Sequence, residues 1–281
     1  MSETYYVAVC SSGISANLNG CIESLIEVKH SIPQSVEIIL VLNHEKKEII
    51  FDDNIQLAFE PERGYANVRN KALSLVPEGA NLIFIDDDES PSREWLCALI
   101  KMHLKYPKDI IVGPVYSSQS QQNSSFRAQR SKEAAISADE SIISQAGAGN
   151  MLIPHEVLDS GLVHFDKHFN LSGSEDTDLC FRLRKNGINI RFAVNAIILE
   201  NEDVHRFDLK YIENRKLKDI VNYSVVIRRN ESLQGIVHRF LTLFARTVFY
   251  FAIGTVRRKH LSNAKIYGRS LIALITGQVK I

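Results

Sequence analysis

Short apolar runs rich in β-branched residues alternate along this chain with segments whose apolar positions recur every three or four residues. The runs that predict buried strands are 5–10, 36–43, 55–61, 81–88 and 109–116. Helical spacing is clearest at 66–76 and 93–107. Because strands and helices alternate, we expect an α/β fold with a mainly parallel sheet flanked by helices.

The strand predicted at 81–88 ends in adjacent acids, since Asp86, Asp87, Asp88 and Glu89 follow the apolar run LIFI. Neighbouring carboxylates repel one another unless a cation compensates them. Ligands of such sheets gather at the carboxyl ends of the strands. One interpretation is therefore a site for Mg²⁺ or Mn²⁺ bridging to a diphosphate. The other is a solvated acidic turn before a helix that begins near Pro91.

A second acidic group, Glu175, Asp176 and Asp178, lies at the start of a predicted helix. Acids at this position are favoured by the helix dipole, with Ser174 as the N-cap. The functional alternative is that one of them is a general base. Small residues around Asn150 suggest backbone that comes close to a ligand.

In this order, the segments resemble the inverting family 2 glycosyltransferases of the GT-A fold. The resemblance covers about residues 5–210. The segments that carry it are VAVCSSG, RGYANVRNKAL, IFIDDDESPSREWL, GAGNMLIPHEVL, FDKHFNLSGSEDTDLCFRLRKNG and EDVHR. The ordered set is more specific than the acidic cluster alone.

The resemblance implies a role for individual residues. Asp176 matches the catalytic base, and Asp88 and His205 match residues that hold a divalent metal, Mn²⁺ or Mg²⁺. The residues that it assigns to donor binding are Ser11, Ser12, Asn43, Arg69, Asn70, Asp86 and Asp87. Asn43 departs from the pattern, because many relatives have an aspartate there.

The implied activity is transfer of a sugar from a nucleotide-diphosphate sugar to a hydroxyl acceptor with inversion. The acceptor would be a sugar or a lipid-linked sugar, in the assembly of bacterial cell-surface polysaccharide or glycolipid. The alternatives are a nucleotidyltransferase, a phosphatase and a non-catalytic nucleotide-sugar binding protein. The segment SSGISANLNG after the first strand has no Lys or Arg, which disfavours the nucleotidyltransferase.

Charge divides the chain, which is neutral as a whole, into an acidic body and a basic tail. Residues 228–281 hold ten Lys or Arg and one acid, a net charge of +9, which leaves −9 for the rest. We expect a glycosyltransferase domain at 1–225 and a helical extension at 226–281. Within 236–260 the apolar pattern is interrupted by a narrow polar stripe. We expect this tail to bind an anionic membrane surface; the alternative is a homodimer contact.

The remaining features bear on location. The N-terminus lacks the pattern of a signal peptide, and the four cysteines are scattered, as in a protein with reduced thiols. We expect a cytoplasmic protein, peripheral at the inner face of the cytoplasmic membrane, with no nucleic-acid partner. The polar segment 117–145 is a candidate lid or acceptor contact.

Overall fold

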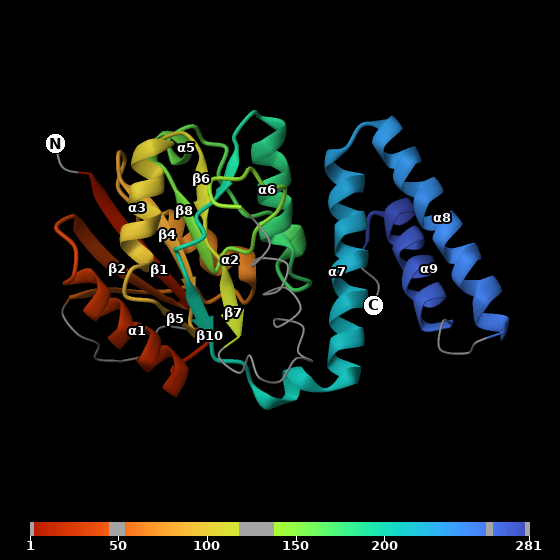
Figure 1. Cartoon of the computed structure of the whole chain (residues 1–281), viewed down its shortest axis with the longest axis horizontal. Helices are drawn as coiled ribbons and strands as arrows, with labels where there is room; N and C mark the ends of the chain where they lie inside the picture. The colour runs from red at the N-terminus through yellow and green to blue at the C-terminus, as the bar shows by residue number, and fades with distance from the viewer. Residues whose placement is uncertain (1–2, 45–53, 118–137, 257–260, 279–281) are drawn as a thin grey trace.

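The structure is a computed structural model that describes residues 3–44, 54–117, 138–256 and 261–278. These residues form an α/β body and a group of C-terminal helices (Figure 1). Most of the polar segment 117–145 lies outside the described residues, so its role as a lid or acceptor contact stays a prediction.

Seven strands form the larger sheet, in the order β3-β2-β1-β4-β8-β6-β9. Their bounds are β1 Thr4–Ser11, β2 Ser35–Leu42, β3 Ile55–Phe59, β4 Asn81–Asp86, β6 Ile110–Val112, β8 Asn150–Ile153 and β9 Ile190–Phe192. Strands β3, β2, β1 and β4 are parallel, as are β6 and β9, whereas β8 is antiparallel to both β4 and β6. The mainly parallel sheet predicted from the sequence is confirmed.

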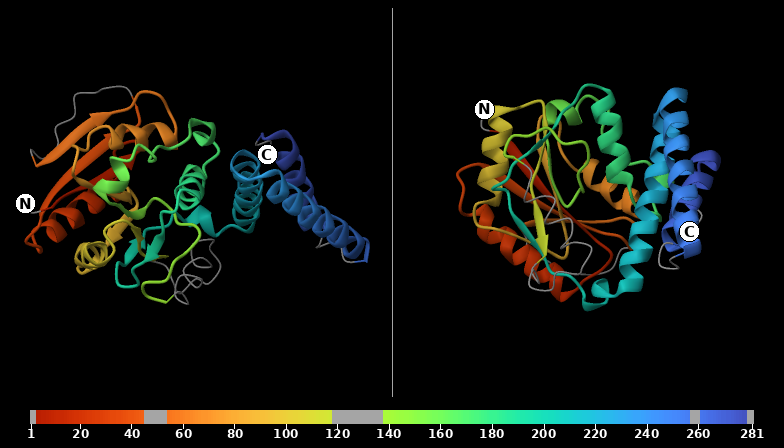
Figure 2. Two further views of the ribbon diagram at one scale, coloured as in Figure 1. Left: turned by 90° about the horizontal axis from the view of Figure 1, so that it is seen from above. Right: turned by 45° about the vertical axis from the view of Figure 1, so that its right-hand side comes forward.

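Helices cover both faces of this sheet, as Figures 1 and 2 show. Helices α1 (Ala16–Lys29) and α3 (Trp95–Lys105) pack on one face. Helices α2 (Tyr65–Leu73), α5 (His155–Leu158) and α6 (Glu175–Lys185) pack on the other. Each face buries a continuous apolar cluster, which explains why the strands are continuous apolar runs in the sequence.

A smaller sheet of three strands has the order β5-β10-β7. Strand β5 (Glu89–Pro91) follows β4 almost directly, and β10 (Ile198–Glu200) pairs antiparallel with it. Strand β7 (Val115–Ser117) pairs parallel with β10. This sheet brings the chain near residue 200 beside the acidic segment that ends β4.

The register of the strands fixes what meets at the functional edge of the larger sheet. Cys10 of β1 is the partner of Asp86 of β4, and Ile85 is the partner of Asn150 of β8. Because β8 is antiparallel to β4, its first residue lies at the carboxyl end of β4. The small residues before Asn150 therefore approach the acids after β4.

The C-terminal extension consists of α7 (Leu209–Asn230), α8 (Leu233–Val256) and α9 (Leu261–Thr276). Helix α7 lies beside α6, and α9 lies between α7 and α8 (Figures 1 and 2). The predicted C-terminal helical extension is confirmed. Helix α7 runs without a break through residues 225 and 226, where the boundary between two domains is expected.

Candidate active site

The acids at the end of β4 are held in a tight turn. The backbone N–H of Asp86 donates to Glu89 Oε2 at 2.9 Å, and the hydroxyl of Ser11 donates to Asp87 Oδ2. Burial raises the pKa of Asp87, and the hydrogen bond from Ser11 partly opposes that effect. The turn therefore keeps adjacent carboxylates at the sheet edge despite their repulsion.

Asp88 is fixed by the smaller sheet and by a cation. Its backbone carbonyl accepts from the N–H of Asn201 at 2.8 Å, and its Oδ2 lies 3.1 Å from Nη2 of Arg206. Arg206 also forms an ion pair with Glu200. Burial, with the charges of Glu200 and Asp86, raises the pKa of Asp88 to about 7. The charge of Arg206 opposes this rise only in part.

Arg69 of α2 joins the two acidic groups that are far apart in the sequence. Its Nη2 lies 3.1 Å from Asp86 Oδ1, and its Nη1 pairs with Glu175. Although burial disfavours the charged guanidinium, Glu175 and Asp86 raise the pKa of Arg69. Glu175 directly precedes Asp176, so the acids after β4 and the first two acids of α6 lie in one site.

Asp176 lies in the first turn of α6, and its side chain is partly exposed. Its Oδ1 accepts from the backbone N–H of Thr177 at 2.6 Å and from the Thr177 hydroxyl at 3.3 Å. The described contacts of this carboxylate thus engage Oδ1 and fix the direction of Oδ2.

The segment just before β8 connects both ends of this site. A Cβ atom at Gly147 would lie 3.7 Å from Asp176 Oδ2. One at Gly149 would lie 2.7 Å from both Asp86 Oδ2 and Glu89 Oε1, where no side chain fits. The sequence GAG at 147–149 permits this close approach, and it belongs to the small residues from which backbone near a ligand is expected.

Asn43 and Ser12 lie at the ends of the neighbouring strands. The amide of Asn43 donates to the carbonyls of Glu60 and Glu62, at 2.9 and 2.8 Å, and its Oδ1 accepts from the N–H of Gly64 at 2.8 Å. It therefore ties β2 to the connection between β3 and α2. Ser12 is exposed in the turn after β1.

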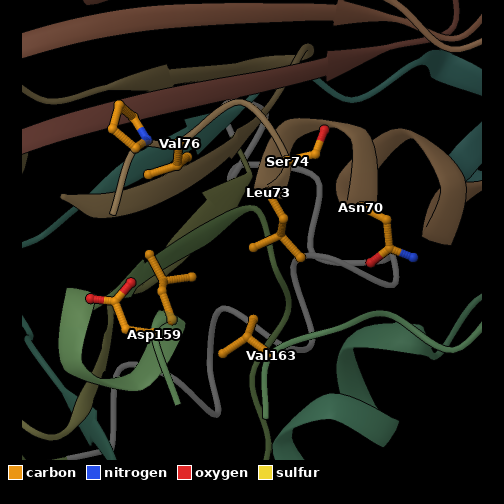
Figure 3. Close-up of a pocket in the computed structure, with 8 residues that line it drawn as sticks. Asn70, Leu73, Ser74, Val76, Asp159 and Val163 are labelled. Carbon is orange, nitrogen blue, oxygen red and sulfur yellow. The ribbon is translucent and has the colours of Figure 1, made fainter. Parts of the chain in front are cut away.

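Asn70 points away from its neighbour Arg69. Its Nδ2 donates to the carbonyl of Phe165 at 2.8 Å, and its Oδ1 accepts from the N–H of Phe165 at the same distance. Asn70 also lines a pocket of about 350 Å³ between α2, α5 and the segment at Val163 (Figure 3). Within the described residues, the lining of this pocket includes none of the acids of the site.

Two other polar residues near the site have structural partners. Asn150 accepts from the indole N–H of Trp95 at 2.8 Å and donates to the carbonyl of Ala196 at 2.7 Å. Asp178 pairs with Arg182 at 2.8 Å and accepts from Asn230 at 2.7 Å, which links α6 to α7. Asp178 therefore holds α6 against α7, unlike Asp176 on the same helix.

The side chains at this edge that could bind a metal are carboxylates, which suit a hard divalent cation. Besides burial, the charges of Glu200 and Asp86 raise the pKa of Asp88, and this crowding of carboxylates is consistent with such an ion. Across the described ranges, no three His, Cys, Asp or Glu side chains are arranged as a complete ligand set. His205 belongs to the short helix η2 (Val204–Phe207), and its side chain lies outside the described part of the chain.

The profile of the family described as glycosyl transferase family 2 matches residues 6–161, more than half of the chain. The chain belongs to this family. The match includes the acids after β4 and the GAG segment, and it ends before Asp176. A search of curated protein sequences finds no significant match.

Solved structures of glycosyltransferases share the fold. The structure of Staphylococcus aureus TarS residues 1–349 matches with a TM-score of 0.56 and 12% identity, over 99% of this chain and 93% of that chain. GalNAc-T7, crystallised with UDP, GalNAc and Mn²⁺, matches with the same TM-score and identity over 81% of this chain. This chain covers 51% of GalNAc-T7, so that protein is about twice the matched length.

These matches establish a family 2 glycosyltransferase with a GT-A fold. The family favours a nucleotide-sugar glycosyltransferase over the nucleotidyltransferase and the phosphatase considered from the sequence. The identity to the solved structures is low, so their likeness concerns the fold alone.

Proposed function

We propose that this glycosyltransferase moves a sugar from a nucleotide-diphosphate sugar to an acceptor hydroxyl with inversion at the anomeric carbon. The observation that carries the proposal is the ion-paired bridge of Arg69 to Asp86 and Glu175. It supports a single site with acids for the departing diphosphate on one side and Asp176 on the other. Inversion needs this separation, because attack and departure occur on opposite faces of the sugar.

Asp176 is proposed as the general base that accepts the proton of the attacking hydroxyl. Its Oδ1 is held by Thr177, and its Oδ2 is directed toward the glycine segment at Gly147. A base needs one oriented oxygen within reach of the acceptor. The hydrogen bonds of Thr177 supply that orientation without engaging Oδ2.

Asp88 and His205 are proposed to hold a divalent metal, Mn²⁺ or Mg²⁺. Such an ion supplies positive charge to the nucleoside diphosphate that leaves. The chain itself positions Asp88 through Asn201 and the smaller sheet. Asp86 is held by Arg69 and Asp87 by Ser11, so that each acid keeps a separate direction.

For the donor, the proposed contacts are Ser11, Ser12, Asn43, Arg69, Asn70, Asp86 and Asp87. Asn43 and Asn70 would act indirectly, because their amides hold backbone segments that surround the site. Arg69 would act mainly by setting the positions of Asp86 and Glu175.

We further propose that the enzyme works at an anionic membrane surface, through the outer face of α8. The large apolar side chains of α8 that are at least 48% exposed are Leu233, Val237, Leu241, Phe244, Val248, Phe249 and Phe251. Positions 237, 241, 244, 248 and 251 follow a 4-3-4-3 spacing and so share one helix face. In Figure 1 this helix forms the outer edge of the molecule.

The cations of α8 lie on its other side. The guanidinium carbon of Arg239 lies 5.0 Å from the ring centre of Tyr223 in α7, and that of Arg246 lies 5.5 Å from the ring centre of Tyr267 in α9. These cation–π contacts direct both arginines toward the neighbouring helices. The inner side of the helix also packs apolar side chains, with Leu243 fully buried, so the exposed apolar face lies outward in addition to an ordinary packed one.

A lipid surface fits this face better than a second copy does. The segment 228–281 has a net charge of +9, which attracts anionic lipids but makes two tails repel each other. The window Leu233–Gly254 is long and apolar enough to cross a membrane by length and composition. The two arginines within it favour a position in the interface. We place the enzyme at the inner face of the cytoplasmic membrane, with a sugar or lipid-linked sugar acceptor for cell-surface polysaccharide or glycolipid.

The proposal is tested by incubating the full chain with a panel of nucleotide-sugars, with and without Mn²⁺, and measuring released nucleoside diphosphate. We expect release from one donor class, stimulated by the metal and by a hydroxyl acceptor. The configuration of the product, read by NMR, must be opposite to that of the donor. Retained configuration would overturn inversion, and no release from any donor would favour the non-catalytic binding protein.

A further inference from the structure

Arg206 connects the acid site to the segment that leads into the C-terminal helices. It belongs to η2, between β10 and α7. Its Nη2 lies 3.1 Å from Asp88 Oδ2, and its Nη1 bonds the carboxylate of Glu200, whose side chain is 3% exposed. One guanidinium thus clamps two acids from different parts of the chain, Asp88 in the turn between β4 and β5 and Glu200 in β10.

The clamp occupies the carboxylate that the proposed function assigns to the metal. A divalent ion prefers the same carboxylate oxygens that accept hydrogen bonds from Arg206. Charges of +2 and +1 within a few ångströms also repel each other strongly in a partly buried site. Because Arg206 contacts Asp88 Oδ2 directly, a metal held by Asp88 would lie beside this guanidinium.

Resting on that proposed function, we propose that Arg206 is an internal counter-cation of Asp88 that a divalent metal must displace. Without metal, Arg206 compensates part of the charge of Asp88 and Glu200 and so stabilises the fold. When metal binds, the guanidinium leaves Asp88 and the metal takes over the compensation. Displacement makes metal binding weaker than the acids alone would allow.

The experiment measures Mn²⁺ binding to the full chain by isothermal titration calorimetry and by the EPR signal of free Mn²⁺. The proteins compared are the wild type, Arg206→Gln, Arg206→Lys and the control Arg229→Gln. Arg229 of α7 pairs with Asp166 at 2.6 Å, so its substitution changes the net charge equally at another place. We expect Arg206→Gln to bind Mn²⁺ roughly 5- to 150-fold more tightly than the wild type. Arg206→Lys should fall between them, and Arg229→Gln should match the wild type.

Thermal melting of the same proteins gives a second measurement. Arg206→Gln should melt at a lower temperature than the wild type without metal and should gain more from Mn²⁺. Equal or weaker Mn²⁺ affinity in Arg206→Gln would overturn the proposal, and so would absence of Mn²⁺ binding in every variant. If the wild type still released nucleoside diphosphate from a nucleotide-sugar, the proposed transfer reaction would stand although this inference had failed.

Discussion

Nη2 of Arg69 lies 3.1 Å from Oδ1 of Asp86, and the other terminal nitrogen of the same guanidinium pairs with Glu175. The side chains of Arg69 and Glu175 are 10% and 4% exposed. A buried ion pair contributes little net stability compared with apolar residues, but removal of one partner leaves a buried charge without compensation. Arg69 is thus the residue whose loss should separate the two acidic groups.

We expect Arg69→Gln to destabilise the fold by about 3–5 kcal/mol, because Glu175 then remains buried without its cation. Urea unfolding followed by circular dichroism measures this change. The double variant Arg69→Gln/Glu175→Gln should recover part of the loss, since it removes both charges. Additive losses in the double variant would show that the pair is not coupled.

Asp176→Asn should lower kcat by roughly 10²–10⁴-fold while donor binding is largely kept, because an amide cannot accept the proton. Turnover at saturating donor and acceptor, with donor affinity measured by calorimetry, tests this expectation. Asp178→Asn is the matched control on the same helix. Its contacts with Arg182 and Asn230 predict reduced stability but normal turnover per folded molecule. Normal turnover in Asp176→Asn would exclude Asp176 as the base.

Gly149→Ala should disturb the acids directly, because its Cβ would lie 2.7 Å from Asp86 Oδ2 and from Glu89 Oε1. Shifting these carboxylates or the backbone to admit the methyl group should lower stability by about 1–3 kcal/mol and weaken donor binding. Gly147→Ala is the control, since its Cβ would lie at an ordinary 3.7 Å from Asp176 Oδ2. Thermal melting and calorimetric donor titration compare the two. Equal behaviour of the two variants would contradict the close approach at Gly149.

Several parts of the site follow from the sequence because they depend on local rules. Buried strands end at polar residues, so the place of Asp86 at a strand end was predictable from LIFIDDD. The small residues before Asn150 indicated backbone close to a ligand, which stays a prediction; the structure places Gly149 against the carboxylates of Asp86 and Glu89. The acids of α6 also begin a helix as expected, with Ser174 at the N-cap position. Its side chain does not cap the helix, and its φ of 75° is left-handed.

The tertiary partners of these acids were not predictable. Strands β5 and β10 have three residues each, too short to give a periodic pattern, so the approach of Glu200 and Arg206 to Asp88 leaves no local signal.

Asn70 shows a second limit of prediction from the sequence. Consecutive helical residues point about 100° apart, so Arg69 reaches the acids while its neighbour bonds Phe165. The sequence pair alone does not reveal this division.

The last prediction concerns lipid binding by the outward apolar face of α8. In the full chain, the triple variant Leu241→Ser/Phe244→Ser/Phe251→Ser should bind vesicles with 30% anionic lipid at least roughly tenfold more weakly than the wild type, because it removes apolar area from the proposed lipid contact. Vesicle co-sedimentation measures this. Leu104→Ser on α3, where the side chain is 59% exposed, is the control for loss of a surface apolar residue and should bind normally.

Two further conditions separate lipid binding from self-association through the same face. Binding of the wild type should weaken on neutral vesicles and at high salt, because the +9 charge of 228–281 contributes to the attraction. Sedimentation equilibrium of the wild type without lipid should give a monomer. A dimer that the triple variant abolishes, together with no vesicle binding by the wild type, would assign this face to a second copy of the chain and overturn the membrane proposal.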